Sequence, residues 1–141
     1  MKVAMGADHG GYALKESIKE FLTQEGYEVM DLGCDAPERC DYPVFGKAVA
    51  NAVASGEADK GIVICTTGIG ISIAANKVEG IRCALCTDPF MAKMCRLHND
   101  ANVLSMGAAI TGDLLAKEIA KVFLTTEFSQ GERHVKRVAM L

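Results

Sequence analysis

Short apolar runs alternate with amphipathic segments along the whole chain. Five runs have the length of buried strands, and they lie at Lys2–Met5, Glu28–Leu32, Gly61–Cys65, Arg82–Cys86 and Val103–Met106. Strand and helix patterns that alternate in this way are typical of a parallel sheet covered on both faces. The pattern therefore predicts an α/β fold, a Rossmann-like three-layer αβα sandwich with a five-stranded parallel sheet.

In the segments between these runs, apolar residues recur at the spacing of a helix. The clearest stripes are Leu14-Ile18-Phe21-Leu22, Phe45-Val49-Ala52-Val53 and Leu115-Ile119-Val122-Phe123. Pro43 suits the first turn of the second helix, and Gly26 and Gly56 suit helix ends. Less regular helices are expected at about 69–77 and 89–97, and a short terminal helix near Glu132. With no repeat or linker, we expect residues 1–141 to form a single domain.

Composition narrows the class of protein. No apolar run approaches the ~20 residues of a membrane span, and the start of the chain is too short for a signal peptide and reads as a strand. A net charge of −3 argues against a nucleic-acid partner. We therefore expect a cytoplasmic protein with no membrane or nucleic-acid partner, whose six cysteines are free thiols. Cys83-x-x-Cys86 lies in a strand pattern that points its two thiols to opposite faces, so we interpret both as core residues.

The turn after the third apolar run carries the strongest chemical signal. Ligands of a parallel sheet bind at the carboxyl ends of its strands, and this strand ends in Cys65-Thr66-Thr67-Gly68-Ile69-Gly70-Ile71-Ser72. Unpaired amides and the positive end of a helix favour a thiolate. Cys65 is thus a candidate base or nucleophile, and the amides could hold an oxyanion or a phosphate. A buried structural cysteine is the alternative, but the nearby Asp8-His9 loop favours chemistry.

Familiar phosphate-binding motifs do not match this turn. The chain has no GxxxxGK[ST] loop, and Gly6-x4-Gly11 is not GxGxxG. A cysteine phosphatase would need an arginine six positions after its cysteine, and Ile71 stands there. These classes are therefore excluded.

Two histidines and two arginines complete the set of candidates. His9 follows Asp8 at a strand end, and His98 precedes Asn99 shortly before another strand; either imidazole could move a proton near neutral pH. The helix before His98 should run away from the Cys65 edge, so we expect His98 to reach the site of a second subunit in a two-fold dimer.

Arg133 and Arg137 would share one face of the terminal helix. Such a pair suits a phosphate dianion, although a solvated basic face is an equally good interpretation of two arginines at this spacing. The pair stands out because the chain as a whole is acidic.

In their order, these motifs resemble those of the type B ribose-5-phosphate isomerases, and the galactose-6-phosphate isomerase subunits are similar. The resemblance spans nearly the whole chain and rests on Gly6-Ala7-Asp8-His9-Gly10-Gly11, Asp41-Tyr42-Pro43, Cys65 to Lys77, His98-Asn99-Asp100-Ala101-Asn102-Val103-Leu104 and Arg133-His134-x-x-Arg137. It implies a homodimer with shared active sites or a dimer of dimers, and neither metal nor organic cofactor. The segment of about 131–141 would then contribute to the site or to the dimer interface.

The resemblance also implies roles for single residues. Cys65 would take the C2 proton of an open-chain aldose phosphate to form a cis-enediolate, with Thr67 assisting the thiol. His98 would help to open the sugar ring. The expected contacts with substrate are Asp8, His9, Thr66, Gly68, Ile69, Gly70 and Asn99. His9, Arg133 and Arg137 would receive the phosphate.

Two departures from the family pattern bear on the substrate. Thr66 stands where the family commonly has glycine, and Ala109 stands where many members have a phosphate-binding arginine. The resemblance implies ribose 5-phosphate and ribulose 5-phosphate as the reacting pair in carbohydrate metabolism, specifically the pentose phosphate pathway. Allose 6-phosphate or galactose 6-phosphate is the alternative substrate, and a non-catalytic sugar-phosphate-binding module is the alternative from another class.

Overall fold

A five-stranded parallel sheet forms the centre of the molecule. The computed structural model describes residues 1–141, and its strands are β1 (Lys2–Ala7), β2 (Glu28–Asp31), β3 (Lys60–Cys65), β4 (Cys83–Leu85) and β5 (Val103–Gly107). They lie in the order β2-β1-β3-β5-β4, and every neighbouring pair is parallel. The predicted sheet is confirmed.

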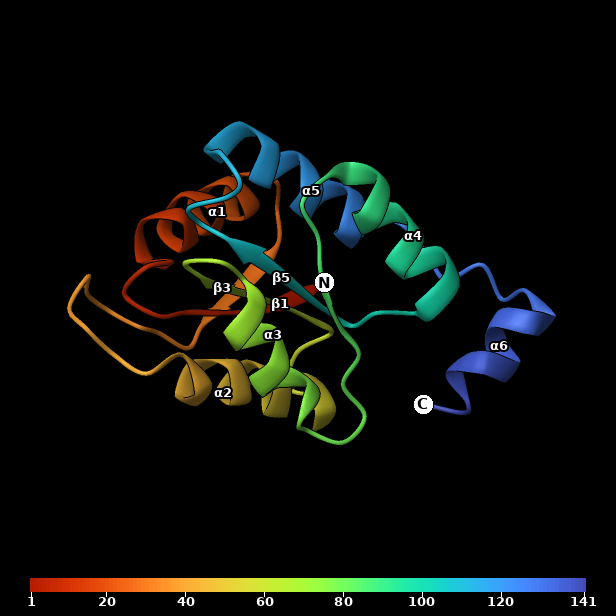
Figure 1. The fold of residues 1–141 in the computed structure, drawn as a ribbon. Helices are drawn as coiled ribbons and strands as arrows, with labels where there is room; N and C mark the ends of the chain where they lie inside the picture. Colours follow the sequence, from red (N-terminus) through yellow and green to blue (C-terminus); the bar gives the residue numbers. More distant parts are fainter.

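Helices cover both faces of this sheet. They are α1 (Tyr12–Gln24), α2 (Tyr42–Ala54), α3 (Ile69–Asn76), α4 (Pro89–Asn99), α5 (Asp113–Thr125) and α6 (Glu132–Val138). Figure 1 shows α1, α4 and α5 on one face and α2 and α3 on the other. Ile62 and Ile64 belong to the core beneath the first layer, whereas Val63 and Cys65 belong to the core beneath the second. This alternation is the strand period of two that the three-layer prediction requires.

The helix-end signals of the sequence are also confirmed. Gly26 and Gly56 follow α1 and α2 with φ of +92° and +80°, a backbone region that glycine enters without steric cost. Pro43 lies in the first turn of α2. Cys83 packs against the α2/α3 core and Cys86 against the opposite one, so this pair is structural, as interpreted.

Several predicted boundaries differ from the structure by one residue, and two differ by two residues. We expected the first strand to end at Met5, but β1 continues to Ala7, because Ala7 donates its N–H to Gly33 O at 2.7 Å and pairs with Ile64. The fourth helix was expected to end at Leu97, but α4 reaches Asn99. It ends there because Asp100 takes a left-handed conformation, φ +46°.

Arg96 and Asp100 stabilise the longer α4. The Asp100 carboxylate accepts hydrogen bonds from Arg96 Nη1 at 2.8 Å and from Arg82 Nη2 at 3.2 Å. His98 and Asn99 therefore belong to the last turn of a helix and not to a loop before the fifth strand.

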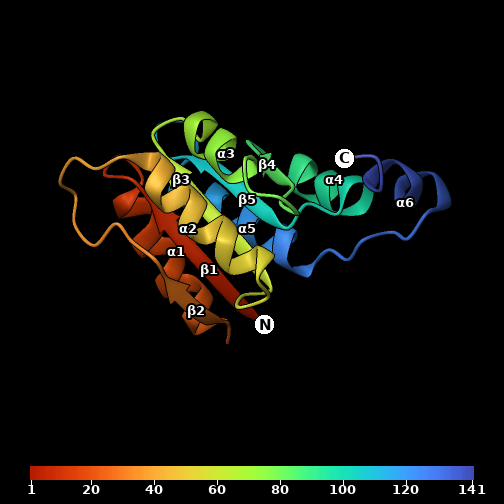
Figure 2. The ribbon, with the colours of Figure 1, turned by 90° about the horizontal axis from the view of Figure 1, so that it is seen from below.

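The terminal helix α6 stands apart from the three layers. Figure 2 shows it beyond the end of α4, at the far side of the molecule from α1. None of its residues is buried, and it packs against α4. No helix of the chain combines the length and apolarity that crossing a membrane requires.

Candidate active site

Cys65 is held at the carboxyl end of β3 by the turn that follows it. Its side chain is buried, and the Gly68 N–H donates to its Sγ at 3.1 Å. Gly68 has φ +78° and precedes the first turn of α3, and a Cβ there would come within 2.7 Å of the Met106 carbonyl carbon. Only glycine fits this turn, and the turn aims an amide at the sulfur. A donor at this distance stabilises negative charge on sulfur.

The rest of the turn opens toward solvent. Thr66, Thr67 and Ile69 are exposed, and the Ile69 N–H donates to Thr67 Oγ1 at 3.2 Å. The N–H groups of the first turn of α3 lack acceptors within the helix. The turn therefore carries the amides of a helix N-terminus, as the sequence predicted, and two exposed threonine side chains.

The loop after β1 lies directly against this turn. A Cβ at Gly10 would overlap Thr66 Oγ1, so the two loops touch. Asp8 is buried, and its Oδ1 accepts the Gly11 N–H at 3.0 Å. The structure thus brings Asp8, Thr66 and Cys65 to one edge of the sheet.

A cavity of about 700 Å³ opens beside these loops. Its lining consists of Asp8, His9, Arg39, Cys40, Asp41, Tyr42, Pro43 and Val44. His9 Nδ1 lies against the Cys40 backbone, 3.2 Å from its N–H and 3.3 Å from its carbonyl oxygen, so this ring is fixed on the loop that precedes α2. Burial, followed by the neighbouring Cys34, raises the pKa of Cys40 to about 11.

Arg39 and the ring of Tyr42 are contributions that the sequence interpretation missed. Arg39 lines this cavity together with His9 and is exposed, so it offers a positive charge at this edge. Tyr42 lies against Gly70, where a Cβ would come within 2.7 Å of its Cζ. Its place in Asp41-Tyr42-Pro43 was the only available signal, and for Arg39 the sequence offered none beyond its polar surroundings.

A second, smaller cavity lies at the other end of the molecule. It measures about 220 Å³ and is lined by His98, Asn99, His134, Arg137, Val138 and Leu141. The His98 and His134 rings are stacked, with centroids 4.4 Å apart and planes at 12°. Desolvation, with the positive charges of His98, Arg133 and Arg137, lowers the pKa of His134 below its usual 6.5.

The predicted site residues thus form two groups within one chain. Asp8 and His9 line the first cavity and His98, Asn99 and Arg137 the second, and the two linings share no residue. His98 stands at the end of α4, opposite the edge where Cys65 lies, as the sequence predicted. The predicted phosphate ligands are also divided, because His9 belongs to the first group and Arg137 to the second. Arg133, which donates to His134 Nε2 at 3.5 Å, is adjacent to the second.

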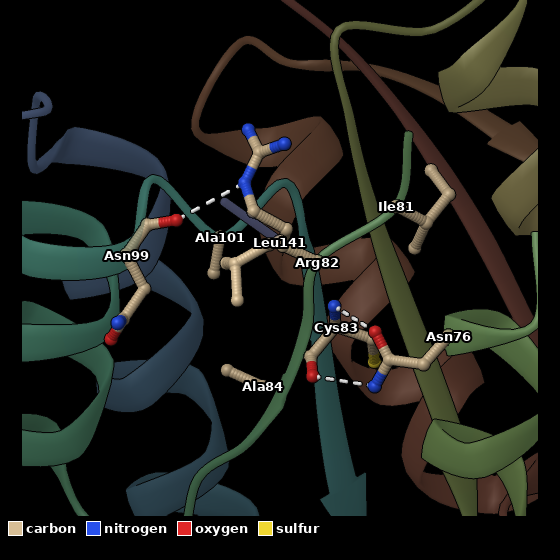
Figure 3. A pocket seen from close by; sticks show the side chains of 8 residues that line it. All are labelled: Asn76, Ile81, Arg82, Cys83, Ala84, Asn99, Ala101 and Leu141. Carbon is tan, nitrogen blue, oxygen red and sulfur yellow. Dashed lines mark hydrogen bonds between the residues drawn. The ribbon is translucent and has the colours of Figure 1, made fainter. Parts of the chain in front are cut away.

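A third cavity, of about 370 Å³, adjoins the second and carries none of the predicted catalytic residues. Figure 3 shows how its polar groups are engaged. The Asn76 amide donates to Cys83 O at 2.9 Å and accepts the Cys83 N–H at 2.7 Å, so it covers the open edge of β4. Arg82 Nε donates to Asn99 O at 3.1 Å. These groups stabilise the end of the sheet.

The two departures from the family pattern both lie at the Cys65 edge. Ala109 is exposed and donates its N–H to Thr66 O at 3.0 Å. The loop after β5 therefore packs on the Cys65 turn. An alanine there adds no charge to the site, and Arg39 is a cation that lines the same cavity as His9. No group of three or more His, Cys, Asp or Glu side chains is arranged to hold a metal ion.

Comparison with known proteins gives the class that this fold and site define. The family model of the Ribose/Galactose Isomerase family matches residues 3–141. The structure of ribose-5-phosphate isomerase B from Clostridium thermocellum superposes with a TM-score of 0.98 at 56% identity, covering 99% of this chain and 94% of that one.

Two curated relatives carry different substrate names. Ribose-5-phosphate isomerase B of Escherichia coli (strain K12) is 49% identical over 137 residues, which cover 97% of this chain and 91% of the relative. A galactose-6-phosphate isomerase subunit of Clostridium acetobutylicum is 44% identical over 128 residues, 91% of this chain and 74% of the relative. The chain belongs to the ribose/galactose isomerase family and is a sugar-phosphate isomerase.

Proposed function

We propose that this isomerase interconverts ribose 5-phosphate and ribulose 5-phosphate, with Cys65 as the base. The observation that carries the proposal is the buried Cys65 sulfur 3.1 Å from the Gly68 amide, at the start of a helix. A thiolate in that position takes the C2 proton of the open-chain aldose and returns it to C1. The C2–H electron pair forms a C1=C2 double bond and the carbonyl pair moves to O1, which gives a cis-enediolate. A proton then passes from O2 to O1, and the proton held by Cys65 returns to C1 as the ketose carbonyl forms at C2.

The amides of residues 66–70 act on the developing oxyanion. Preorganised N–H donors that meet charge only as it forms lower the barrier of the chemical step. Thr67 accepts the Ile69 N–H, so its hydroxyl hydrogen is free to contact the thiol or the substrate. Asp8, beside Thr66, holds a sugar hydroxyl.

The remaining groups come from a second subunit. Cys65 and His98 act on one sugar phosphate in this scheme, and the two cavities of one chain are separate. A homodimer therefore combines the first cavity of one subunit with the second cavity of its partner. His98 then protonates the ring oxygen to open the furanose, with Asn99 on a hydroxyl. The phosphate is received by His9 of the subunit that provides Cys65, together with Arg133 and Arg137 of the partner subunit. Such a reaction belongs to the pentose phosphate pathway, in the cytoplasm, and needs no cofactor.

Galactose 6-phosphate or allose 6-phosphate is the second candidate substrate. The galactose-6-phosphate isomerase subunit from Clostridium acetobutylicum supports it, as does Ala109, since a missing cation on that loop alters how the phosphate end is held. A non-catalytic binding module no longer fits, because the chain belongs to a family of isomerases.

An isomerase assay on wild type and Cys65→Ala tests the proposal. Wild type should form ribulose 5-phosphate from ribose 5-phosphate, and should do so faster than it converts six-carbon phosphates at equal concentration. Cys65→Ala should lose turnover and solvent exchange at C2 while still binding the sugar. A higher kcat/KM on a six-carbon sugar phosphate would show that galactose 6-phosphate or allose 6-phosphate is the better substrate. A Cys65→Ala variant that retains activity would contradict the proposed mechanism.

A further inference from the structure

Ser105 is a buried hydroxyl on the middle of β5. It is 0% exposed and pairs in register with Val63 of β3 and Leu85 of β4. Val103, two residues earlier on the same strand, belongs to the core beneath α2 and α3, so Ser105 points to that same face. A hydroxyl in such a place costs stability unless it forms a hydrogen bond.

Its hydrogen-bond partner is the turn that holds Cys65. Ser105 Oγ donates to the Gly68 carbonyl oxygen at 2.6 Å. The only other donor to that carbonyl is the Ser72 N–H at 3.3 Å, in the first turn of α3. Of the two hydrogen bonds that fix this carbonyl, the one from the Ser105 hydroxyl is therefore the shorter.

Fixing the carbonyl also fixes the amide on the same peptide. A trans peptide is planar, so its C=O and N–H point in opposite directions. The Gly68 carbonyl points inward to Ser105, and the Ile69 N–H of that peptide therefore points outward, where it donates to Thr67 Oγ1 at 3.2 Å. Ser105 thus orients an amide and a hydroxyl of the site from below.

We propose that Ser105 is a positioning residue of the isomerase, which aims the Ile69 amide and the Thr67 hydroxyl at the reacting sugar without touching it. This inference rests on the proposed function, because it needs the turn after β3 to stabilise the oxyanion. Direct loss of one oxyanion donor typically costs 10²–10³ in kcat, and misalignment of a retained donor costs less, so removing the Ser105 hydroxyl should lower kcat about tenfold.

A matched pair of variants tests it. Ser105→Thr and Ser105→Val have the same shape and differ only in the hydroxyl, so both place the same extra methyl group in the core. On ribose 5-phosphate, kcat of the Thr variant should exceed that of the Val variant about tenfold, with KM for the two within about twofold, since the amides act on the transition state. Ser105→Ala should match the Val variant, and circular dichroism should confirm that each variant is folded.

A distant serine provides the control. Ser55 Oγ donates to Ala52 O at 3.2 Å at the end of α2, and Ser55→Ala should leave kcat unchanged. Equal kcat for the Thr and Val variants, or a loss confined to KM or to stability, would overturn the positioning role. The proposed function would stand in that case as long as the wild type is active. A wild type inactive on every sugar phosphate would instead overturn the function itself, and the role of Ser105 with it.

Discussion

At the scale of single residues, the account depends on what each side chain can donate or accept. Cys65 has one amide on its sulfur and two exposed threonines after it in the chain, an environment that suits the proposed proton transfer at carbon. His98 lies at the end of α4, stacked on His134 and away from that sulfur. In the proposed mechanism the two residues serve different steps, and each step can be tested by itself.

The proposed ring-opening role of His98 predicts a dependence on substrate shape. His98→Asn should lower kcat/KM on ribose 5-phosphate, which is mostly cyclic, by roughly 10²-fold, the usual contribution of a general acid. A four-carbon aldose 4-phosphate cannot close a furanose ring, because its O4 carries the phosphate. On that substrate the same variant should lose only a few-fold. Equal losses on both substrates would assign His98 to binding instead.

Lys15 is a second residue whose environment predicts the effect of a substitution, here on the stability of the fold. Its side chain is fully buried, and Nζ lies 2.7 Å from Asp31 Oδ1 and 3.0 Å from Glu16. Burial alone would raise the pKa of Asp31, but hydrogen bonds from Lys15, Lys19 and Gly33 outweigh it and lower the pKa. Lys15→Met should lower the free energy of unfolding by about 2 kcal/mol, because Asp31 loses its buried partner while Lys19 still holds it at 2.7 Å.

Urea denaturation of that variant gives the measurement. Lys117→Met is the control, because Lys117 pairs with the exposed Asp113 and such surface pairs contribute at most about 1 kcal/mol. Similar losses for the two variants would show that the Lys15 pair adds nothing beyond an ordinary surface interaction.

At the scale of elements, α4 and α6 together form the second cavity. The protonation of His134 on α6 makes the stability of the protein depend on pH. Because the pKa of His134 is lowered in the folded protein, the unfolded chain takes up its proton more readily. The contribution of the neutral ring is therefore present above the unfolded pKa of about 6.5 and is lost as the pH falls through the lower folded value.

Thermal melting of wild type and His134→Gln can detect this linkage. Between about pH 7.5 and about pH 5, wild type should lose more stability than the variant, since all other groups titrate in both. Parallel curves across that interval would contradict a neutral His134 in the folded state.

The sequence predicted these elements better than their ends. Short apolar runs predicted the five strands, and apolar stripes of period 3.6 predicted α1, α2 and α5, because these patterns follow from which residues are buried. The extension of α4 to Asn99 was missed, since it depends on Asp100 adopting a left-handed conformation with Arg96 and Arg82 on its carboxylate. Local sequence does not encode that long-range pairing with Arg82.

The same limit applied to the site. Cys65, Thr67 and the glycine turn could be found from the sequence because they are contiguous and follow a strand. Arg39 and Ser105 could not, because their relation to the turn arises only when separate strands and loops pack together. His98 could be predicted in part. Its separation from Cys65 followed from the direction in which a crossover helix runs, but its stacking on His134 did not.

At the scale of the whole molecule, one chain carries two separate cavities, which the proposed mechanism treats as two halves of one site. The carboxyl edge of the sheet provides the thiol and the amides, and the far end provides the imidazoles and arginines. Figure 1 shows α6 extending from the body of the molecule at that far end. A two-fold dimer that brings each half to its complement gives two equivalent sites.

Mixing two inactive variants tests this shared site most directly. Cys65→Ala and His98→Asn are co-expressed or refolded together, and turnover of ribose 5-phosphate is measured against each variant alone. A mixed dimer would hold one site with both native groups, so random pairing should restore about a quarter of wild-type activity. The double variant Cys65→Ala/His98→Asn, mixed with either single variant, should restore none. A mixture of the single variants no more active than its components would contradict a site that is shared between subunits.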